Sequence, residues 1–194
     1  MTTKKQPPVE LDELLAAEYS YIAQTATQAF EDRARVSSFY LIAVGSLIAA
    51  LFSTQLFQPE QFTQTVKLIF SGLFLLLTML GASTVMQLAQ LRSAWYESMR
   101  AMNQIKDFAM KQHPELANAF RWRTETLPAK YKKGSVSYYQ AVEVALIGGL
   151  MFAAATFFLQ QAYFTTSMVN WLLSGLAGVA MWYIDLFIYK KLLK

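Results

Sequence analysis

Four long apolar runs, separated by polar segments, dominate the pattern of this chain. The runs cover residues 39–57, 68–88, 141–159 and 171–189. A helix needs about 20 apolar residues to cross the roughly 30 Å hydrocarbon layer of a bilayer. Short connections join the runs in pairs, at residues 58–65 and 160–170. The pattern therefore predicts an all-α fold, an integral membrane four-helix bundle made of two helical hairpins.

The first two predicted helices continue well beyond the bilayer. Neither residues 10–57 nor residues 66–112 contain a proline. In both polar sections, apolar side chains recur every three or four residues, which is typical of a helix with one buried face. Seven of these side chains are predicted to make the contacts of an antiparallel cytosolic stalk: Leu15, Tyr19, Ile22, Trp95, Met99, Met102 and Ile105. The stalk packs either within one protomer or also between protomers, since two helices alone leave apolar surface uncovered.

The remaining segments are shorter. Residues 1–9 are polar and predict a flexible cytosolic tail, whereas residues 138–160 and 169–191 predict the helices of the second hairpin. Between them, residues 113–135 predict a short cytosolic or interfacial helix, from Glu115 to about Thr126, followed by a turn and an N-cap at Gly134 and Ser135. Aromatic and basic residues alternate there, as expected for an interfacial anchor or else a ligand site: Arg121, Trp122, Arg123 and Tyr131.

Basic residues predict the orientation of the hairpins. Lysine and arginine are concentrated before the first apolar run, between the second and third, and after the fourth, whereas the short connections are nearly free of them. Cytoplasmic loops carry this excess in membrane proteins. The N-terminus, central section and C-terminus are therefore predicted to be cytoplasmic. The net charge of +4 then indicates contact with anionic headgroups rather than with nucleic acid.

Two acidic residues, Glu143 and Asp185, lie within the second predicted hairpin. An unpaired acid facing lipid is costly, so each is expected to face protein, water or a basic partner. Arg33, Arg35 and Arg92 lie at a similar depth on the first hairpin. Structural ion pairs are one interpretation, and acids that line a cation path in an oligomer are the other.

The composition argues against enzymatic chemistry. The chain has no cysteine and a single histidine, His113, which leaves no thiolate chemistry and no paired histidine ligands for haem or zinc. No nucleophile with a neighbouring base and no glycine-rich phosphate loop is present. The sequence therefore predicts a non-enzymatic protein without catalytic residues, cofactor or metal.

A family resemblance points in the same direction. The layout of a helical N-terminal segment, two spans and a long basic cytoplasmic section resembles that of small bacterial membrane proteins of the SLATT type. It is more loosely similar to multi-span effectors of antiphage defence systems. Residues 18–24 and 31–35, together with residues 121–123, Leu127 and Pro128, also resemble an uncharacterised bacterial four-span family. The second hairpin departs from the two-span SLATT pattern. The resemblance implies a bacterial inner membrane location and an oligomeric channel or membrane disruptor.

Three functions fit these features. The first is a homo-oligomeric pore or ion channel controlled through the stalk, where a cytosolic protein or a small messenger would bind. The second is a membrane anchor or assembly subunit whose stalk recruits a soluble partner or packs in a larger complex. The third is a small transporter, disfavoured because the sequence shows no broken helix and no ionic residue at the membrane midplane.

Overall fold

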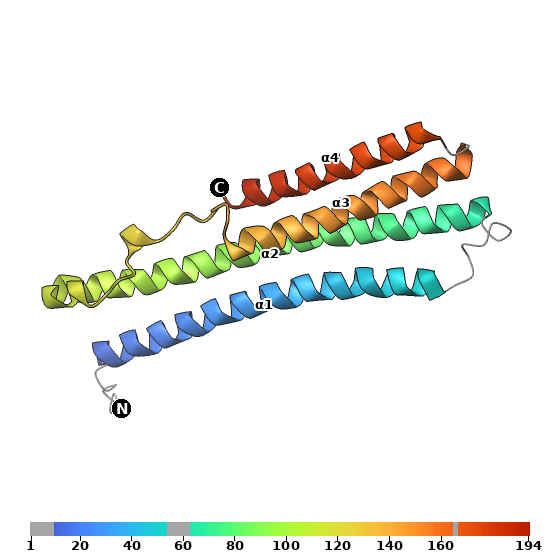
Figure 1. Ribbon diagram of the computed structural model, residues 1–194. Helices are drawn as coiled ribbons and strands as arrows, with labels where there is room; N and C mark the ends of the chain where they lie inside the picture. Colours follow the sequence, from blue (N-terminus) through green and yellow to red (C-terminus); the bar gives the residue numbers. More distant parts are fainter. Residues whose placement is uncertain (1–9, 54–62, 165–166) are drawn as a thin grey trace, which may run out of the picture.

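The computed structural model describes residues 10–53, 63–164 and 167–194 and shows an all-α four-helix bundle (Figure 1). Its helices are α1 (Leu11–Ser53), α2 (Gln64–Gln112), α3 (Val136–Tyr163) and α4 (Met168–Leu192). No strand occurs in these described ranges. The predicted tail at residues 1–9 and the last part of the first predicted span, from residue 54, lie outside them.

Helix α2 is the central element of the bundle. It packs against α1 and α3 along much of its length and also contacts α4, while α3 and α4 form the second hairpin. Both α1 and α2 are single helices that pass from a polar section into an apolar section, as the stripe of apolar residues predicts. They extend past the ends of α3 and α4 on one side (Figure 1).

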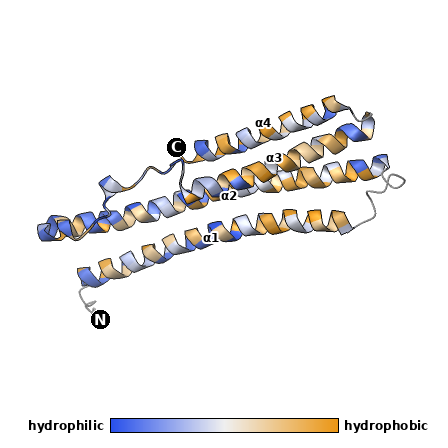
Figure 2. Cartoon of the chain, viewed as in Figure 1, coloured by the Kyte–Doolittle hydropathy of each residue, from blue (hydrophilic) through white to orange (hydrophobic). Residues whose placement is uncertain are grey.

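Hydropathy divides the molecule along its length. The part in which all four helices run together is mostly hydrophobic, whereas the extension of α1 and α2 is mixed and largely hydrophilic (Figure 2). Each of the four helices is long and apolar enough to cross a membrane. A multi-pass membrane protein is the architecture that these lengths and compositions support.

The two-helix extension, here called the stalk, is stabilised by its own apolar cluster. Ile22, Ala26 and Met102 are buried in it, and they are surrounded by Tyr19, Trp95, Met99 and Ile105. All the predicted stalk contacts except Leu15 belong to this cluster. The predicted antiparallel pairing of the polar sections is therefore present in a single protomer.

Close backbone contact joins α3 to α4. A Cβ atom added to Gly178 would lie 2.6 Å from the carbonyl oxygen of Gly149 and 2.8 Å from the Cβ of Ala153. Side chains this small let helix backbones approach within a membrane. At the start of α3, Gly134 adopts a positive φ of 77° and the Ser135 hydroxyl accepts a hydrogen bond from Tyr138 N at 3.2 Å. The predicted turn and N-cap are confirmed.

The segment between α2 and α3 differs from the prediction. Instead of one helix from Glu115 to about Thr126, it forms two short 3-10 helices, η2 (Pro114–Asn118) and η3 (Thr124–Thr126), which pack on α2. The break between them is stabilised by Arg123, whose guanidinium donates hydrogen bonds to the carbonyls of Ala117 and Phe120. These bonds satisfy two backbone carbonyls that a continuous helix would pair with its own amides.

Candidate functional site

Asp185 is the most completely enclosed charged residue of the described structure. Its side chain has 0% exposure, and neither carboxylate oxygen has a hydrogen-bond partner. It comes from α4, near the end where the stalk leaves the bundle. A carboxylate without donors in hydrocarbon is costly unless it takes up a proton or a cation. Asp185 is therefore the first candidate for a functional group.

The Tyr40 hydroxyl of α1 lies beside this carboxylate. Tyr40 is also fully buried and its hydroxyl has no partner. A Cβ added to Gly148 of α3 would lie 3.4 Å from Asp185 Oδ2 and 3.8 Å from the Tyr40 hydroxyl, so both oxygens face the same point. A Cβ on Gly81 of α2 would lie only 2.7 Å from that hydroxyl. All four helices therefore contribute to one enclosed polar site.

The site lies deeper in the bundle than the position of Asp185 in the sequence suggests. Gly148 is near the middle of α3, about 18 Å along the helix from Val136. Side chains on a helix point back toward its N-terminus, which for α4 is the end remote from the stalk. The Asp185 carboxylate thus reaches into the apolar section, and its neighbours are glycines rather than cations.

Further buried polar atoms lack partners around this site, and all of them except that of Trp182 lie between the site and the stalk. Besides Tyr40 and Asp185, the buried atoms that lack a hydrogen bond are Arg33 Nε, Ser37 Oγ, Gln140 Oε1 and Trp182 Nε1. At the opposite end, the bundle is filled by aromatic rings, with Phe158 centroids 5.4 Å from Phe70 and 5.6 Å from Phe74. The half of the interior that faces the stalk, here called the polar half, therefore holds most of the unpartnered polar atoms. The other half also buries Ser71 and Ser174, but both are hydrogen-bonded.

Two arginines lie where this polar half meets the stalk. Arg33 of α1 is 4% exposed and donates a hydrogen bond to the Ser137 hydroxyl, while Arg92 of α2 is 7% exposed and donates from Nε to the Lys130 carbonyl at 3.2 Å. Burial, and then the neighbouring Arg92 guanidinium, lower the pKa of Arg33. Burial likewise lowers the pKa of Arg92. Burial and mutual repulsion thus both disfavour the charged forms of the two guanidiniums.

The expected ion pairs between the acids and these arginines are not formed. No salt bridge joins Glu143 or Asp185 to Arg33, Arg35 or Arg92, all of which the structure describes. Arg35 pairs instead with Asp32 at 3.1 Å on the stalk surface. Arg33 contacts α3 at Ser137, whereas Asp185 lies near Gly148, about 16 Å further along that helix. The acids and the arginines were predicted to lie at a similar depth in the membrane, but they do not contact one another.

Glu143 has a different environment from Asp185. It is exposed on the outer side of α3, as are Tyr139 and Leu146 on the same helix. The two acids hence do not share a path inside one protomer. A path that included Glu143 would run between protomers.

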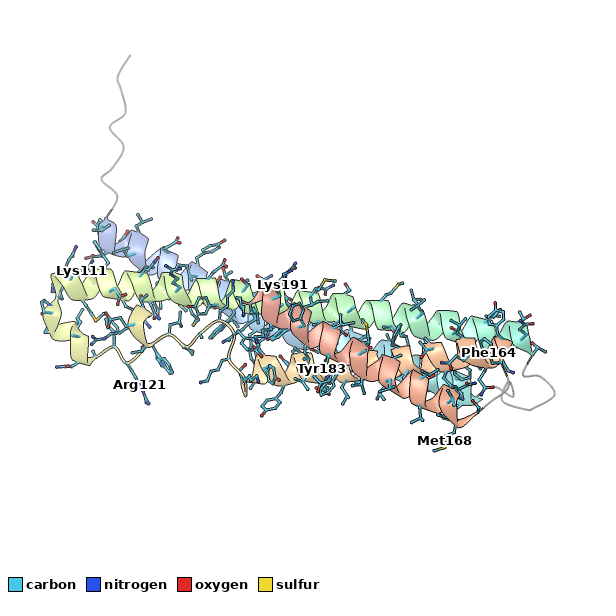
Figure 3. The ribbon with its side chains drawn as sticks, turned by 90° about the horizontal axis from the view of Figure 1, so that it is seen from above. Lys111, Arg121, Phe164, Met168, Tyr183 and Lys191 are labelled. Atoms are coloured by element: carbon cyan, nitrogen blue, oxygen red, sulfur yellow. The ribbon has the colours of Figure 1, made fainter. Side chains whose placement is uncertain are left out.

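The predicted interfacial anchor is divided between two places. Thr124 donates a hydrogen bond to Asp107, about 28 Å beyond Leu88 along α2, and Arg123 lines a cleft with Asp107 there. Trp122 lines a second cleft with Trp95 and Met99, nearer the bundle. Arg121 lies toward the same end of the stalk as Lys111, whereas Lys191 marks the end of α4 (Figure 3). This distance from the apolar section does not suit contact with headgroups.

Tyr131 alone of the predicted anchor residues lies at the base of the stalk. Its ring is 6.1 Å from that of Tyr138 and 6.4 Å from that of Tyr189. The sequence did not single out Tyr40, Gly148, Ser137 or Tyr189 as site residues. A tyrosine within an apolar run was the one visible signal, because glycine and serine positions are too common to distinguish.

Comparison with protein-family models, with curated proteins and with solved structures finds no match. The resemblance to SLATT proteins and antiphage effectors thus stays a prediction. Within the described residues, no group of three or more histidine, cysteine, aspartate or glutamate side chains is arranged to hold a metal ion. Arguments about function therefore rest on the geometry of the buried polar residues.

Proposed function

We propose that this chain is a non-enzymatic, channel-like membrane protein that takes up protons or small cations at Asp185 from the side of the stalk. The observation that carries the proposal is the enclosed carboxylate of Asp185, which has no donor and faces the unpartnered Tyr40 hydroxyl. An ionisable residue inside the membrane usually marks a proton or ion pathway. The buried polar atoms toward the stalk support entry from that side.

The same geometry changes the form of the pore hypothesis. Asp185 is enclosed by its own protomer, whereas Glu143 faces outward on α3. Conduction through Asp185 would require the Phe70, Phe74 and Phe158 rings to separate, since they fill the other half of the bundle. Binding at Asp185 would therefore act on a closed resting state, and the stalk would be the element that opens it.

Proton flux into liposomes tests the proposal. Full-length protein is reconstituted with a pH-sensitive dye inside, and a potassium diffusion potential drives proton entry. We expect Asp185→Asn to reduce the flux at least tenfold, because the amide cannot release a proton, and Tyr40→Phe to reduce it less. Glu143→Gln, which removes the exposed acid, should leave the flux within about twofold of the wild type.

Two results would contradict the proposal. Wild-type protein that conducts neither protons nor sodium, with or without a cytosolic extract, would rule out the channel-like function. Normal flux in Asp185→Asn together with loss or altered ion selectivity in Glu143→Gln would move the pathway to the surface between protomers.

An anchor or assembly subunit is the second candidate. Its support is an open, mainly apolar groove of about 420 Å³ along the stalk, lined by Tyr19, Ala23, Phe30, Trp95, Met99 and Met102 among others. Exposed apolar surface on a polar extension is typical of a protein interaction site. A wild type without conductance would favour this function.

A further inference from the structure

A pair of buried cations without an anion lies at the junction of the stalk and the membrane section. Arg33 and Arg92 come from neighbouring helices and are both more than nine-tenths buried. No described acidic residue forms a salt bridge with either of them. Buried charges in proteins are normally paired, because an uncompensated one is strongly destabilising. Among the described residues, the pair therefore has no anionic partner.

Most of the hydrogen-bonding capacity of the two guanidiniums is unused. Each guanidinium has five N–H donors. Arg33 donates one hydrogen bond, to the hydroxyl of Ser137, and its Nε is buried without a partner. Arg92 also donates one, to the carbonyl of Lys130. Both acceptors are neutral. The guanidiniums otherwise lie over aromatic rings, Arg92 4.3 Å from the Trp95 centroid and Arg33 5.3 Å from that of Phe30, so neither has an anionic partner among the described residues.

The depth of the pair suits a phosphate group. Arg33 precedes the first apolar run by about 9 Å along α1, and Arg92 follows the second by about 6 Å along α2. Headgroups occupy roughly 5–8 Å on each side of the hydrocarbon layer. Lys190 and Lys191, in the last turn of α4, add positive charge on the same side of the bundle. Guanidinium groups match the oxygen geometry of phosphate better than ammonium groups do.

We propose that Arg33 and Arg92 form a binding site for a phosphate group, carried either by an anionic lipid headgroup or by a free phosphate compound. The proposal is independent of ion uptake at Asp185. The site is covered by the non-helical segment that contains Lys130 and Tyr131. Arg92 donates to the Lys130 carbonyl, and the Tyr131 ring packs edge-on to Tyr138 and Tyr189. A phosphate that replaces the Lys130 carbonyl would accept the Arg92 Nε hydrogen bond with an ionised oxygen, so donor and acceptor would carry opposite charges.

Two arms of one experiment distinguish the sources of the phosphate. In the first, delipidated full-length protein in neutral detergent is titrated with phosphatidylglycerol or phosphatidylcholine, and native mass spectrometry measures the bound lipid. In the second, thermal unfolding is followed in sodium phosphate and in sodium chloride of equal ionic strength. Preferential retention of phosphatidylglycerol identifies a lipid site. Stabilisation by phosphate over chloride identifies a site for free phosphate only if Arg33→Gln loses it, because phosphate also stabilises folded proteins without a site.

Substitutions test whether the binding belongs to this pair. Arg33→Gln and Arg92→Gln should each weaken the binding about tenfold, since a hydrogen bond to a charged group contributes on that scale. Arg35→Gln is the matched control, because Arg35 is on the same helix with an exposed side chain and should bind as the wild type does. Arg33→Lys, which keeps the charge, should give an intermediate loss of binding. It replaces Arg33→Gln in the comparison if the Gln variant folds poorly.

The proposal is overturned if the wild type shows neither lipid preference nor stabilisation by phosphate. It is also overturned if Arg35→Gln weakens binding as much as Arg33→Gln and Arg92→Gln do, because the effect would then reflect general surface charge.

Discussion

At the residue scale, single positions decide how closely the helices approach. Gly178 touches the backbone of Gly149, whereas Gly175, one turn earlier on α4, has nothing within 4 Å of an added Cβ. The same contrast separates Gly81, which contacts the Tyr40 hydroxyl, from Gly72, whose surroundings are open. Glycines on one helix thus differ completely in what a methyl group would meet.

The first prediction compares two alanine substitutions on α4. Gly178→Ala should lower the free energy of unfolding by about 1–3 kcal/mol, because the added methyl group overlaps backbone atoms that cannot move aside freely. Gly175→Ala should raise it by up to about 1 kcal/mol, because alanine favours the helix and meets no neighbour. Unfolding in mild detergent, followed by tryptophan fluorescence, measures both. Equal effects would contradict the packing of α3 on α4.

At the element scale, the stalk depends on contacts between α1 and α2. Ile22 is buried against α2, whereas Leu14, two turns earlier on α1, is 53% exposed. Because the polar sections contain few other apolar contacts, local opening of the stalk should require less free energy than opening of the membrane section.

The second prediction concerns this local stability. Ile22→Ala should weaken the stalk by about 2–4 kcal/mol through lost burial and the cavity left behind, while Leu14→Ala should change it by less than about 0.5 kcal/mol. Amide hydrogen exchange measures both effects, with the membrane amides as the internal reference. A comparable loss in Leu14→Ala would mean that a second protomer covers that face of α1, as the interpretation of stalk packing between protomers requires.

At the scale of the whole molecule, both ends of the described structure can be marked chemically. Arg121 lies toward the far end of the stalk, and Met168 lies at the opposite end of the bundle (Figure 3). The chain contains no cysteine, so a single introduced cysteine gives an unambiguous label.

The third prediction is that a membrane-impermeant maleimide labels Met168→Cys in intact cells but labels Arg121→Cys only after the membrane is made permeable. The physical reason is the distribution of lysine and arginine, which favours retention of the stalk side in the cytoplasm. Gel shift of the labelled protein measures the outcome. The reverse pattern would invert the orientation and move the entry side proposed for Asp185 out of the cytoplasm.

Much of the fold follows from the amino-acid pattern alone. Four apolar runs predict the four helices because backbone groups in hydrocarbon must bond within their own segment. The repeating stripe predicts the stalk because a helix with one apolar face must cover it. Ser135 predicts the start of α3 because a hydroxyl satisfies a free backbone amide there.

The partners of the buried polar groups depend on the three-dimensional packing. Asp185 was visible as a membrane acid, yet its neighbour is Tyr40 rather than an arginine. Arg33 and Arg92 bond to a hydroxyl and to a backbone carbonyl rather than to an acid. Helical periodicity specifies which face of a helix is buried, but not the rotation and axial offset of one helix against the next. The relative position of two helices depends on close contacts such as that of Gly149 with Gly178. Because neither residue has a side chain, the backbones of α3 and α4 can approach closely at this point.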